Sequence, residues 1–505
     1  MAESLRLAAI DLGAESGRVV LGRLDGDRVA LEVVHRFVNR PLWLPDGLHW
    51  NLPTLFADAL RGLGTAAASG ALHGVGVDAW GCDYALLDGE NRMLGLPFHY
   101  RDSRTSPAVL AAVHERVSRE DLYDRTGIQT MPLNTVFQLS AERSGAAAAA
   151  AHRIALIPDL FGLWLTGTPS NEITAASTTG LLDARSAGWA RDLADRLGLP
   201  ARPFAGEPAA PGHGLGPVLG GHRDLAGGAV GTAVHAVAGH DTASAFAAAP
   251  VRDEHAAILS SGTWSLLGVQ RSTPQLGPEA RAYNFSNERG IGDTVRLLRN
   301  VMGLWLVAQC RRAWSAGAGG PDYDELHRLA ARARPDVALF DPDDPSLLHG
   351  ADTPGEIAGL CTAGGQAAPA GRGELVRSIL VSLACKYRLV LEQLEAVTGR
   401  RIDVVHVVGG GARNRLLCRL TAELTRREVL AGPVEATALG NVLVQALALG
   451  EISGLGQLRR MAAASADPER YEPAEGAAGA AAEEAYERFL EVTGLTADRP
   501  LTTRA

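Results

Sequence analysis

The sequence predicts an α/β protein with two domains. The chain has 505 residues, which is too many for one compact core. Its hydrophobic content of 46% and charged content of 21% are typical of a folded protein. A strand, a short turn rich in Gly, Ser or Thr and a second strand occur at residues 11–20 and again at residues 259–267. A duplicated fold with a central cleft would show this repetition near the start of each half.

In the first half, short apolar runs alternate with glycine-containing turns. Tight turns at residues 13–17 and 25–27 join three strands, and a Trp-Gly-Cys-Asp turn joins two more. The alanine run at 146–151 is the end of a helix or a loop, and residues 200–228 form a loop rich in Gly and Pro. The predicted strands are residues 5–12, 18–24, 29–37, 74–78, 84–87 and 230–237; the predicted helices are residues 55–69, 110–116, 122–125 and 154–165.

A domain boundary is expected at residues 250–254, because a new pair of strands starts beyond them. The second half is predicted to contain strands at 257–260, 265–269 and 403–408 and helices at 301–314, 375–397 and 414–424. The prediction is therefore an N-terminal domain at 1–250, a C-terminal domain at 251–455 and a helical tail at 456–505.

Composition excludes several classes of function. A net charge of −9 and a pI near 5.9 argue against a nucleic-acid-binding protein. No apolar run reaches the ~20 residues that span a bilayer, and the N-terminus lacks the apolar stretch of a signal peptide. Five cysteines without a C-x-x-C pair favour a reducing, cytoplasmic setting. Lys386 is the only lysine, so neither a Walker A motif nor a protein-kinase strand lysine is present.

The segment Val237-Ala-Gly-His-Asp-Thr-Ala-Ser-Ala245 carries the strongest catalytic signal. It places the Asp241 carboxylate between an imidazole and a hydroxyl, directly after an apolar run that ends in glycine. A strand that ends in a small turn and presents an aspartate there can supply a general base.

Three turns are rich in glycine and hydroxyl groups. In Asp11-Leu-Gly-Ala-Glu-Ser-Gly-Arg18, backbone N–H groups could bind an anion, Ser16 adds a hydroxyl and Asp11 could hold hydrated Mg²⁺. Ser260-Ser-Gly-Thr-Trp-Ser265 could bind the same phosphate chain, and the triple glycine of Val407-Val-Gly-Gly-Gly-Ala-Arg-Asn414 suits an adenosine site. Each turn could equally be an ordinary hairpin or strand-to-helix connection.

Two further segments combine polar and aromatic side chains, as sugar sites do: Gly76-Val-Asp-Ala-Trp-Gly-Cys-Asp-Tyr84 and Tyr100-Arg-Asp-Ser-Arg-Thr105. Core packing of Trp80 and a solvated salt-bridge cluster are the alternatives. The stretch Asp341-Pro-Asp-Asp344 is interpreted as a solvated acidic turn, and the dispersed histidines do not support a zinc site.

Taken together and in this order, these motifs resemble the FGGY family of carbohydrate kinases, over residues 7–450. The match is best to the branch of that family that acts on L-rhamnulose. Further motifs that carry the resemblance are His35-Arg-Phe37, Gly127-Ile-Gln129, Asn300-Val-Met-Gly-Leu-Trp305 and Ala431-Gly-Pro-Val-Glu-Ala-Thr437.

The resemblance implies an actin-like (ribonuclease H-like) fold of two ATPase domains around a cleft. It implies transfer of the ATP γ-phosphate to O1 of L-rhamnulose, with ATP and Mg²⁺ as cofactors. The roles it implies are general base for Asp241; sugar contacts for Gly81, His240, Asp241, Thr242 and Asn300; nucleotide contacts for Ala14, Glu15, Ser16, Gly17, Arg18, Thr263, Gly409, Gly410 and Gly411; and Mg²⁺ binding for Asp11.

Two rival functions stay open. One is a kinase for another ketose such as L-fuculose, and the other is a non-catalytic actin-like nucleotide switch that needs no base at Asp241. We expect no nucleic acid or membrane partner, and the protein to be a monomer or homodimer. A polar side chain expected near the nucleotide after Trp305 is Ala308 here, which leaves a nucleotide role for Gln309 in doubt.

Overall fold

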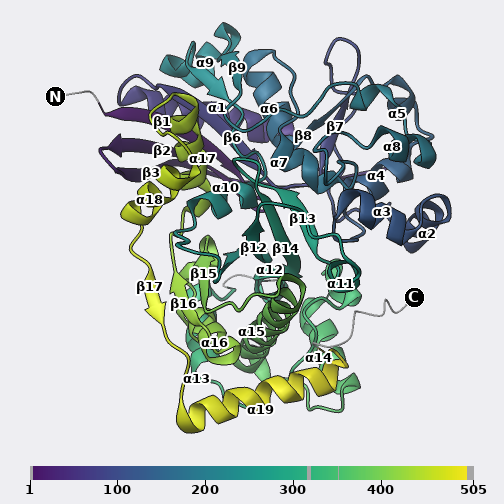
Figure 1. Cartoon of the computed structure of the whole chain (residues 1–505), viewed down its shortest axis with the longest axis vertical. Coiled ribbons are helices and arrows are strands. Elements are labelled where there is room, and N and C mark those ends of the chain that lie inside the picture. Colours follow the sequence, from purple (N-terminus) through teal and green to yellow (C-terminus); the bar gives the residue numbers. More distant parts are fainter. Residues whose placement is uncertain (1–3, 316–319, 351, 497–505) are drawn as a thin grey trace. The chain divides into compact units, whose positions relative to one another are not determined.

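The computed structural model describes residues 4–315, 320–350 and 352–496 (Figure 1). The chain forms two compact units. Unit 1 comprises Met1–Pro250, Arg271–Leu297 and Glu435–Ala466, and unit 2 comprises Val251–Gln270, Leu298–Val434 and Asp467–Ala505. This grouping differs from the predicted domain boundaries in two places, since residues 271–297 and 435–466 are grouped with the N-terminal part of the chain.

Unit 1 is built on a six-stranded sheet in the order β3-β2-β1-β6-β10-β9. Strands β1 and β6 are parallel, as are β6 and β10, whereas β1–β2, β2–β3 and β10–β9 are antiparallel. These strands are β1 Leu5–Leu12, β2 Ser16–Asp25, β3 Arg28–Val38, β6 Gly74–Ala79, β9 Gly214–Pro217 and β10 Ala233–His235. Two small antiparallel sheets pair β4 Leu42–Leu44 with β5 Gly47–His49 and β7 Tyr84–Leu87 with β8 Arg153–Leu156.

The helices of unit 1 include members on both faces of its main sheet. They are α1 Leu52–Ala68, α2 Pro107–Arg116, α3 Arg119–Thr126, α4 Thr135–Glu142, α5 Ala146–Ala150, α6 Ile157–Thr166, α7 Ile173–Ala176, α8 Arg191–Leu197, α9 Arg223–Ala226, α10 Asp241–Ala248, α11 Pro278–Ala282, α17 Ala436–Ala448 and α18 Leu455–Ser465. On β2, a Cβ at Gly22 would lie 2.7 Å from Val442 of α17, whereas a Cβ at Gly62 of α1 would meet Val19 at 2.3 Å. Positions 19 and 22 of a strand face opposite sides, so α1 and α17 pack on opposite faces.

The second sheet has seven strands in the order β13-β14-β12-β11-β15-β16-β17, and its β13 end is grouped with unit 1. Its strands are β11 Ala256–Ser261, β12 Trp264–Arg271, β13 Ser286–Arg289, β14 Val295–Met302, β15 Val404–Val408, β16 Glu428–Ala431 and β17 Glu469–Tyr471. The helices of unit 2 are α12 Trp305–Ala313, α13 Tyr323–Arg332, α14 Thr353–Ala363, α15 Gly371–Thr398, α16 Arg415–Thr425 and α19 Gly476–Thr493.

Several local predictions were wrong, and each error concerns a short apolar run. Residues 153–156 form β8 before α6 begins, and residues 295–302 form β14 before α12 begins. The strand predicted at 230–237 is only three residues long. Periodicity cannot distinguish a buried strand from a buried helix over so few residues.

The acidic turn at 341–344 is also not simply solvated. The ammonium group of Lys386, whose side chain is fully buried, lies 2.7 Å from Asp341 and 3.1 Å from Asp343. Burial raises the pKa of Asp341, but the charge of Lys386 outweighs this effect and lowers that pKa below its ordinary value. The turn therefore neutralises the only lysine of the chain inside unit 2.

Candidate active site

Two buried aspartates meet at the carboxyl ends of β1 and β6. These strands are parallel, and their register places Asp11 opposite Asp78. Asp11 is 5% exposed and Asp78 is fully buried. Burial raises the pKa of both carboxyls; for Asp78 the negative charge of Asp11 raises it further, well above its ordinary value. The carboxyl ends of parallel strands are the usual ligand-binding edge of an α/β sheet.

Arg18 of β2 partly neutralises this acidic edge. Its Nε and Nη2 groups donate to Oδ2 of Asp11 at 2.8 and 2.6 Å, and its Nη1 lies 3.0 Å from Oε2 of Glu435. Glu435 directly precedes α17, so a segment near the end of unit 1 completes the group. The sequence indicated a phosphate-binding role for Arg18, whereas its contacts within unit 1 are with carboxylates.

The turn between β1 and β2 contains Ala14 and Glu15. The backbone N–H of Gly13 donates to the carbonyl oxygen of Ser16 at 2.9 Å. Asn39 closes the turn from β3, because its backbone N–H donates to Glu15 and its side-chain amide donates to the Gly13 carbonyl. Ser16 is exposed, so its hydroxyl is available to a ligand.

The acidic edge has oxygen ligands suited to a hard divalent cation. Oδ2 of Asp78 accepts from Nδ2 of Asn441 at 2.5 Å, whereas Oδ1 is buried and has no hydrogen-bond partner in the described chain. No group of three or more His, Cys, Asp or Glu residues in the described ranges could hold a metal ion by itself. Mg²⁺ is commonly held by one or two carboxylates together with substrate phosphates, and Asp11 and Asp78 fit that requirement.

Asp241 is the first residue of α10, and its negative charge acts on the two aspartates of the same acidic edge. Its side chain is 31% exposed, and its negative charge contributes to the raised pKa of both Asp11 and Asp78. Its Oδ1 accepts a hydrogen bond from the hydroxyl of Thr242 at 3.1 Å. The positive end of a helix dipole stabilises an ionised carboxylate at this position.

A buried glutamate holds the turn that precedes Asp241. Oε2 of Glu172 accepts from the Gly239 N–H at 2.9 Å and from the Thr174 hydroxyl at 2.6 Å. The Thr174 hydroxyl accepts in turn from the His240 N–H at 3.2 Å. The carbonyl of Gly239 accepts from the Ala79 N–H, which ties the turn to the end of β6.

His240 is oriented by a buried ion pair. Nη2 of Arg296 lies 3.2 Å from Nδ1 of His240 and 3.1 Å from Oε2 of Glu288. Burial alone would raise the pKa of Glu288, but the charge of Arg296 lowers it to about 2. Nδ1 of His240 also lies 3.2 Å from Oε2 of Glu288, so the imidazole ring is held between both members of the pair. Nε2 lies 3.5 Å from Oδ1 of Asp241.

In unit 2, the Ser261–Gly262–Thr263 turn and the triple-glycine turn lie against each other. A Cβ at Gly411 would lie 2.0 Å from Oγ of Ser261, so a side chain there would force the turns apart. Gly409 has φ +83°, a backbone conformation that favours glycine. Ser261 Oγ is buried and has no hydrogen-bond partner among the described residues.

The predicted site residues thus form two groups. Asp11, Arg18, His240, Asp241 and Thr242 come together in unit 1, whereas in unit 2 Gly409 and Gly411 lie against Ser261, two residues before Thr263.

Two predicted sugar contacts lie outside these groups. Gly81 follows β6 and packs against Thr178, and Asn300 is a half-buried residue of β14 in unit 2. Trp80 is 6% exposed; its ring lies 4.1 Å from that of Trp50, and its N–H donates to Asp83. Core packing therefore describes Trp80 better than a sugar-binding face does.

Sequence reasoning assigned no role to Asp78, Glu172, Glu288, Arg296 or Glu435. Asp78 and Glu435 lie inside motifs that the sequence singled out, but no spacing rule brings them beside Asp11 and Arg18. Glu288 and Arg296 carry no local signal, because their importance comes from burial next to His240.

Within the described residues, no helix is long and apolar enough to cross a membrane. The chain matches two family models that cover most of its length: the N-terminal domain of the FGGY family of carbohydrate kinases at residues 7–247, and the C-terminal domain of that family at residues 257–449.

Curated relatives match over nearly the whole chain. Rhamnulokinase of Bacteroides thetaiotaomicron is 39% identical over 478 residues, which is 94% of this chain and 97% of that protein. Rhamnulokinase of Pectobacterium carotovorum is 40% identical over 477 residues, covering 92% of this chain and 93% of the relative.

Solved structures share the fold at low sequence identity. Gluconate kinase from Lactobacillus acidophilus superposes with a TM-score of 0.77 at 15% identity, covering 99% of both chains. Plasmodium falciparum glycerol kinase with ADP gives a TM-score of 0.75 at 14% identity, covering 98% of this chain and 99% of the other. The predicted actin-like fold of two α/β domains is confirmed. The family models and the curated relatives agree, and the chain belongs to the FGGY family of carbohydrate kinases.

Proposed function

We propose that the protein is an ATP-dependent kinase that transfers the γ-phosphate of ATP to O1 of L-rhamnulose, giving L-rhamnulose 1-phosphate and ADP. Two relatives named rhamnulokinase, 39% and 40% identical over more than nine tenths of the chain, support the choice of sugar. The single observation that carries the chemistry is the acidic edge of unit 1, where the negative charge of Asp241 helps to raise the pKa of both Asp11 and Asp78.

Asp241 is the general base in this proposal. A sugar hydroxyl is a weak nucleophile, so a carboxylate that accepts its proton as the O–P bond forms assists transfer. The partial exposure of Asp241 leaves it accessible to a substrate, while Thr242 and the start of α10 fix its position. His240, whose Nε2 lies 3.5 Å from Oδ1 of Asp241, is proposed to contact a sugar oxygen beside the base. Gly81, Thr242 and Asn300 are proposed to contact the sugar.

The nucleotide is proposed to bind to the Ala14–Arg18 turn, Thr263 and Gly409–Gly411. Asp11 and Asp78 would hold Mg²⁺, which supplies charge neutralisation at the transferred phosphoryl group when bound. Arg18 limits the negative charge of the acidic edge, because it pairs with both Asp11 and Glu435. The backbone N–H groups of the glycine turns then donate to phosphate oxygens without added positive charge.

A cytoplasmic location and a monomeric or homodimeric state are part of the same proposal. All five cysteines are unpaired, which suits a reducing compartment. Light scattering of the purified full chain measures the oligomeric state directly.

The test is a coupled ADP-release assay over a panel of ketoses and polyols. We expect L-rhamnulose to give the highest kcat/KM, and a higher value for L-fuculose would reassign the sugar. ADP release that does not rise with any sugar would instead support a nucleotide switch.

The Asp241→Asn variant tests the role of the base. We expect its kcat to fall by about 10²–10⁴-fold while its ATP affinity changes little, because only proton acceptance is removed. Asp27→Asn, at an exposed position, is the matched control. More than a few per cent of wild-type activity in Asp241→Asn would remove the residue from this role.

A further inference from the structure

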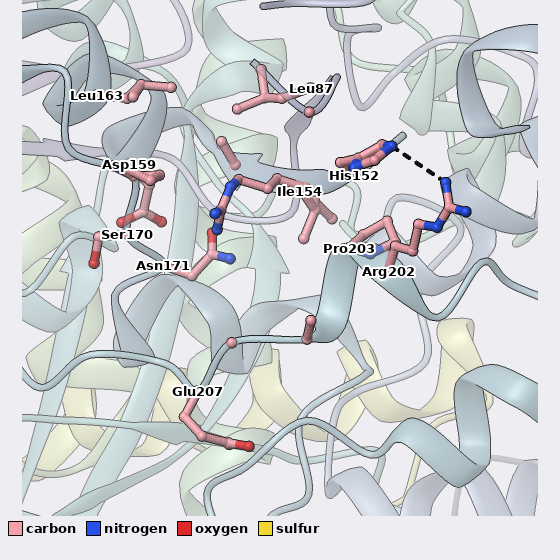
Figure 2. A pocket seen from close by; sticks show the side chains of 16 residues that line it. Leu87, His152, Ile154, Asp159, Leu163, Ser170, Asn171, Arg202, Pro203 and Glu207 are labelled. Atoms are coloured by element: carbon pink, nitrogen blue, oxygen red, sulfur yellow. Dashed lines mark hydrogen bonds between the residues drawn. The ribbon is translucent and has the colours of Figure 1, made fainter. Parts of the chain in front are cut away.

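Unit 1 contains a polar cavity of about 240 Å³ that the proposed reaction does not use. It is lined by the end of β7, by β8, by the first turns of α6 and by residues 169–171, 202–203 and 205–207. Figure 2 shows Asp159, Ser170 and Asn171 on one side of the cavity and the hydrogen-bonded pair of His152 and Arg202 on the other.

One side of the cavity presents acceptor oxygens without partners. Asp159 is 5% exposed, and its Oδ2 is buried and accepts no hydrogen bond from the described residues. Oδ1 of Asn171 is likewise buried and without a partner. Figure 2 shows both side chains directed into the same space. An unsatisfied buried acceptor costs about 1–3 kcal/mol, so a ligand that brings hydroxyl donors to this side would recover that energy.

The other side carries unneutralised positive charge. Nη1 of Arg202 lies 3.3 Å from Nε2 of His152, which is not an anionic partner. Glu207 lies at the rim, but its carboxylate pairs with Arg191. A guanidinium group binds phosphate well, because its N–H donors match the phosphate oxygens.

We propose that this cavity is a second ligand site and that it binds a phosphorylated monosaccharide. The sugar hydroxyls would donate to Asp159 and Asn171, and the phosphate would lie against Arg202. The volume is slightly below the ~300–1,000 Å³ of typical small-molecule sites, which suits a ligand of monosaccharide size. The site is separate from the acidic edge of β1 and β6, since none of its lining residues belongs to those strands.

Two hydrogen bonds connect the cavity to the turn that carries Asp241. Oδ1 of Asp159 accepts from the backbone N–H of Glu172 at 2.8 Å, and Oε2 of Glu172 accepts from the N–H of Gly239 at 2.9 Å. A ligand that orders Asp159 therefore also orders Glu172 and the Gly239–His240–Asp241 segment. Occupancy of the cavity should change kcat as well as add a binding event.

The experiment is a calorimetric titration of the full chain with L-rhamnulose 1-phosphate, with and without saturating L-rhamnulose. The choice of L-rhamnulose 1-phosphate as the probe rests on the proposed function. We expect two binding events, of which L-rhamnulose blocks only the one at the reaction site. The remaining event should weaken at least tenfold in Arg202→Gln and in Asn171→Ala. Arg223→Gln, on an exposed face of unit 1, should leave it unchanged.

Circular dichroism and kcat without added sugar phosphate establish that the variants are folded. A single binding event, or a second event whose Kd is the same in wild type and both variants, would overturn the proposal. Inorganic phosphate binding as tightly as the sugar phosphate would overturn the sugar part of it. Failure of the proposed kinase function is separate, because it appears as absent ADP release with L-rhamnulose.

Discussion

Replacing Glu288 by Gln tests the electrostatics behind His240. The substitution keeps the shape of the side chain and its acceptor for the Ser286 hydroxyl, but it removes the charge opposite Arg296. Arg296 is 1% exposed and Glu288 3% exposed, so water cannot replace the lost partner. Breaking a buried ion pair by removing one member commonly costs 3–5 kcal/mol, because the other charge is left unpaired.

The depressed pKa of Glu288 gives a second measure of this loss of stability. The folded protein lowers it from 4.5 to about 2, which at about 1.4 kcal/mol per unit corresponds to roughly 3 kcal/mol of stability. Since the folded pKa is depressed, this stability is present in full above pH 4.5 and is lost as the pH falls toward 2. The free energy of unfolding of the wild type should therefore exceed that of Glu288→Gln by about 3 kcal/mol at pH 7. At pH 3.5 this difference should be smaller by roughly 1.4 kcal/mol.

The assay is urea denaturation followed by circular dichroism at pH 7, 5 and 3.5. Glu279→Gln is the matched control, because Glu279 is an exposed residue of nearby α11; it should change stability by less than about 0.5 kcal/mol. A loss below about 1 kcal/mol in Glu288→Gln, or one that is the same at pH 3.5 as at pH 7, would refute the reasoning.

Two further substitutions test unit 2. Gly411→Ala would place a Cβ 2.0 Å from Oγ of Ser261, so we expect about 1–3 kcal/mol of destabilisation and a higher KM for ATP. Gly359→Ala, at an exposed position of α14 with no atom within 4 Å, should leave the KM for ATP unchanged; equal KM values in the two variants would contradict the proposed nucleotide turn. Lys386→Met leaves the Asp341 carboxylate without its buried cation, and we expect about 3 kcal/mol of destabilisation at pH 7, measured by urea denaturation. This loss should shrink in acid as the carboxylate is protonated. A loss independent of pH would indicate a packing defect instead.

Local chemistry could be predicted from the sequence where the signal lies within a few residues. The strands at residues 5–12 and 84–87 have the predicted bounds, because largely apolar runs end at clear turn residues. The start of α10 was missed. The apolar run before Asp241 predicts a long strand, but β10 stops at His235 and the chain reaches Asp241 through an irregular segment held by Glu172.

The sequence by itself determined the family, the glycine-rich turns and the candidate aspartates, because these depend on residue types at short spacing. It also excluded a lysine-based phosphate site, since Lys386 is the only lysine. Only the tertiary structure placed Asp78 beside Asp11, bound it to Asn441 across 363 positions of sequence and buried Arg296 behind His240. Strand register and burial arise from contacts between distant segments, and they shift the pKa of Asp11, Asp78 and Arg296.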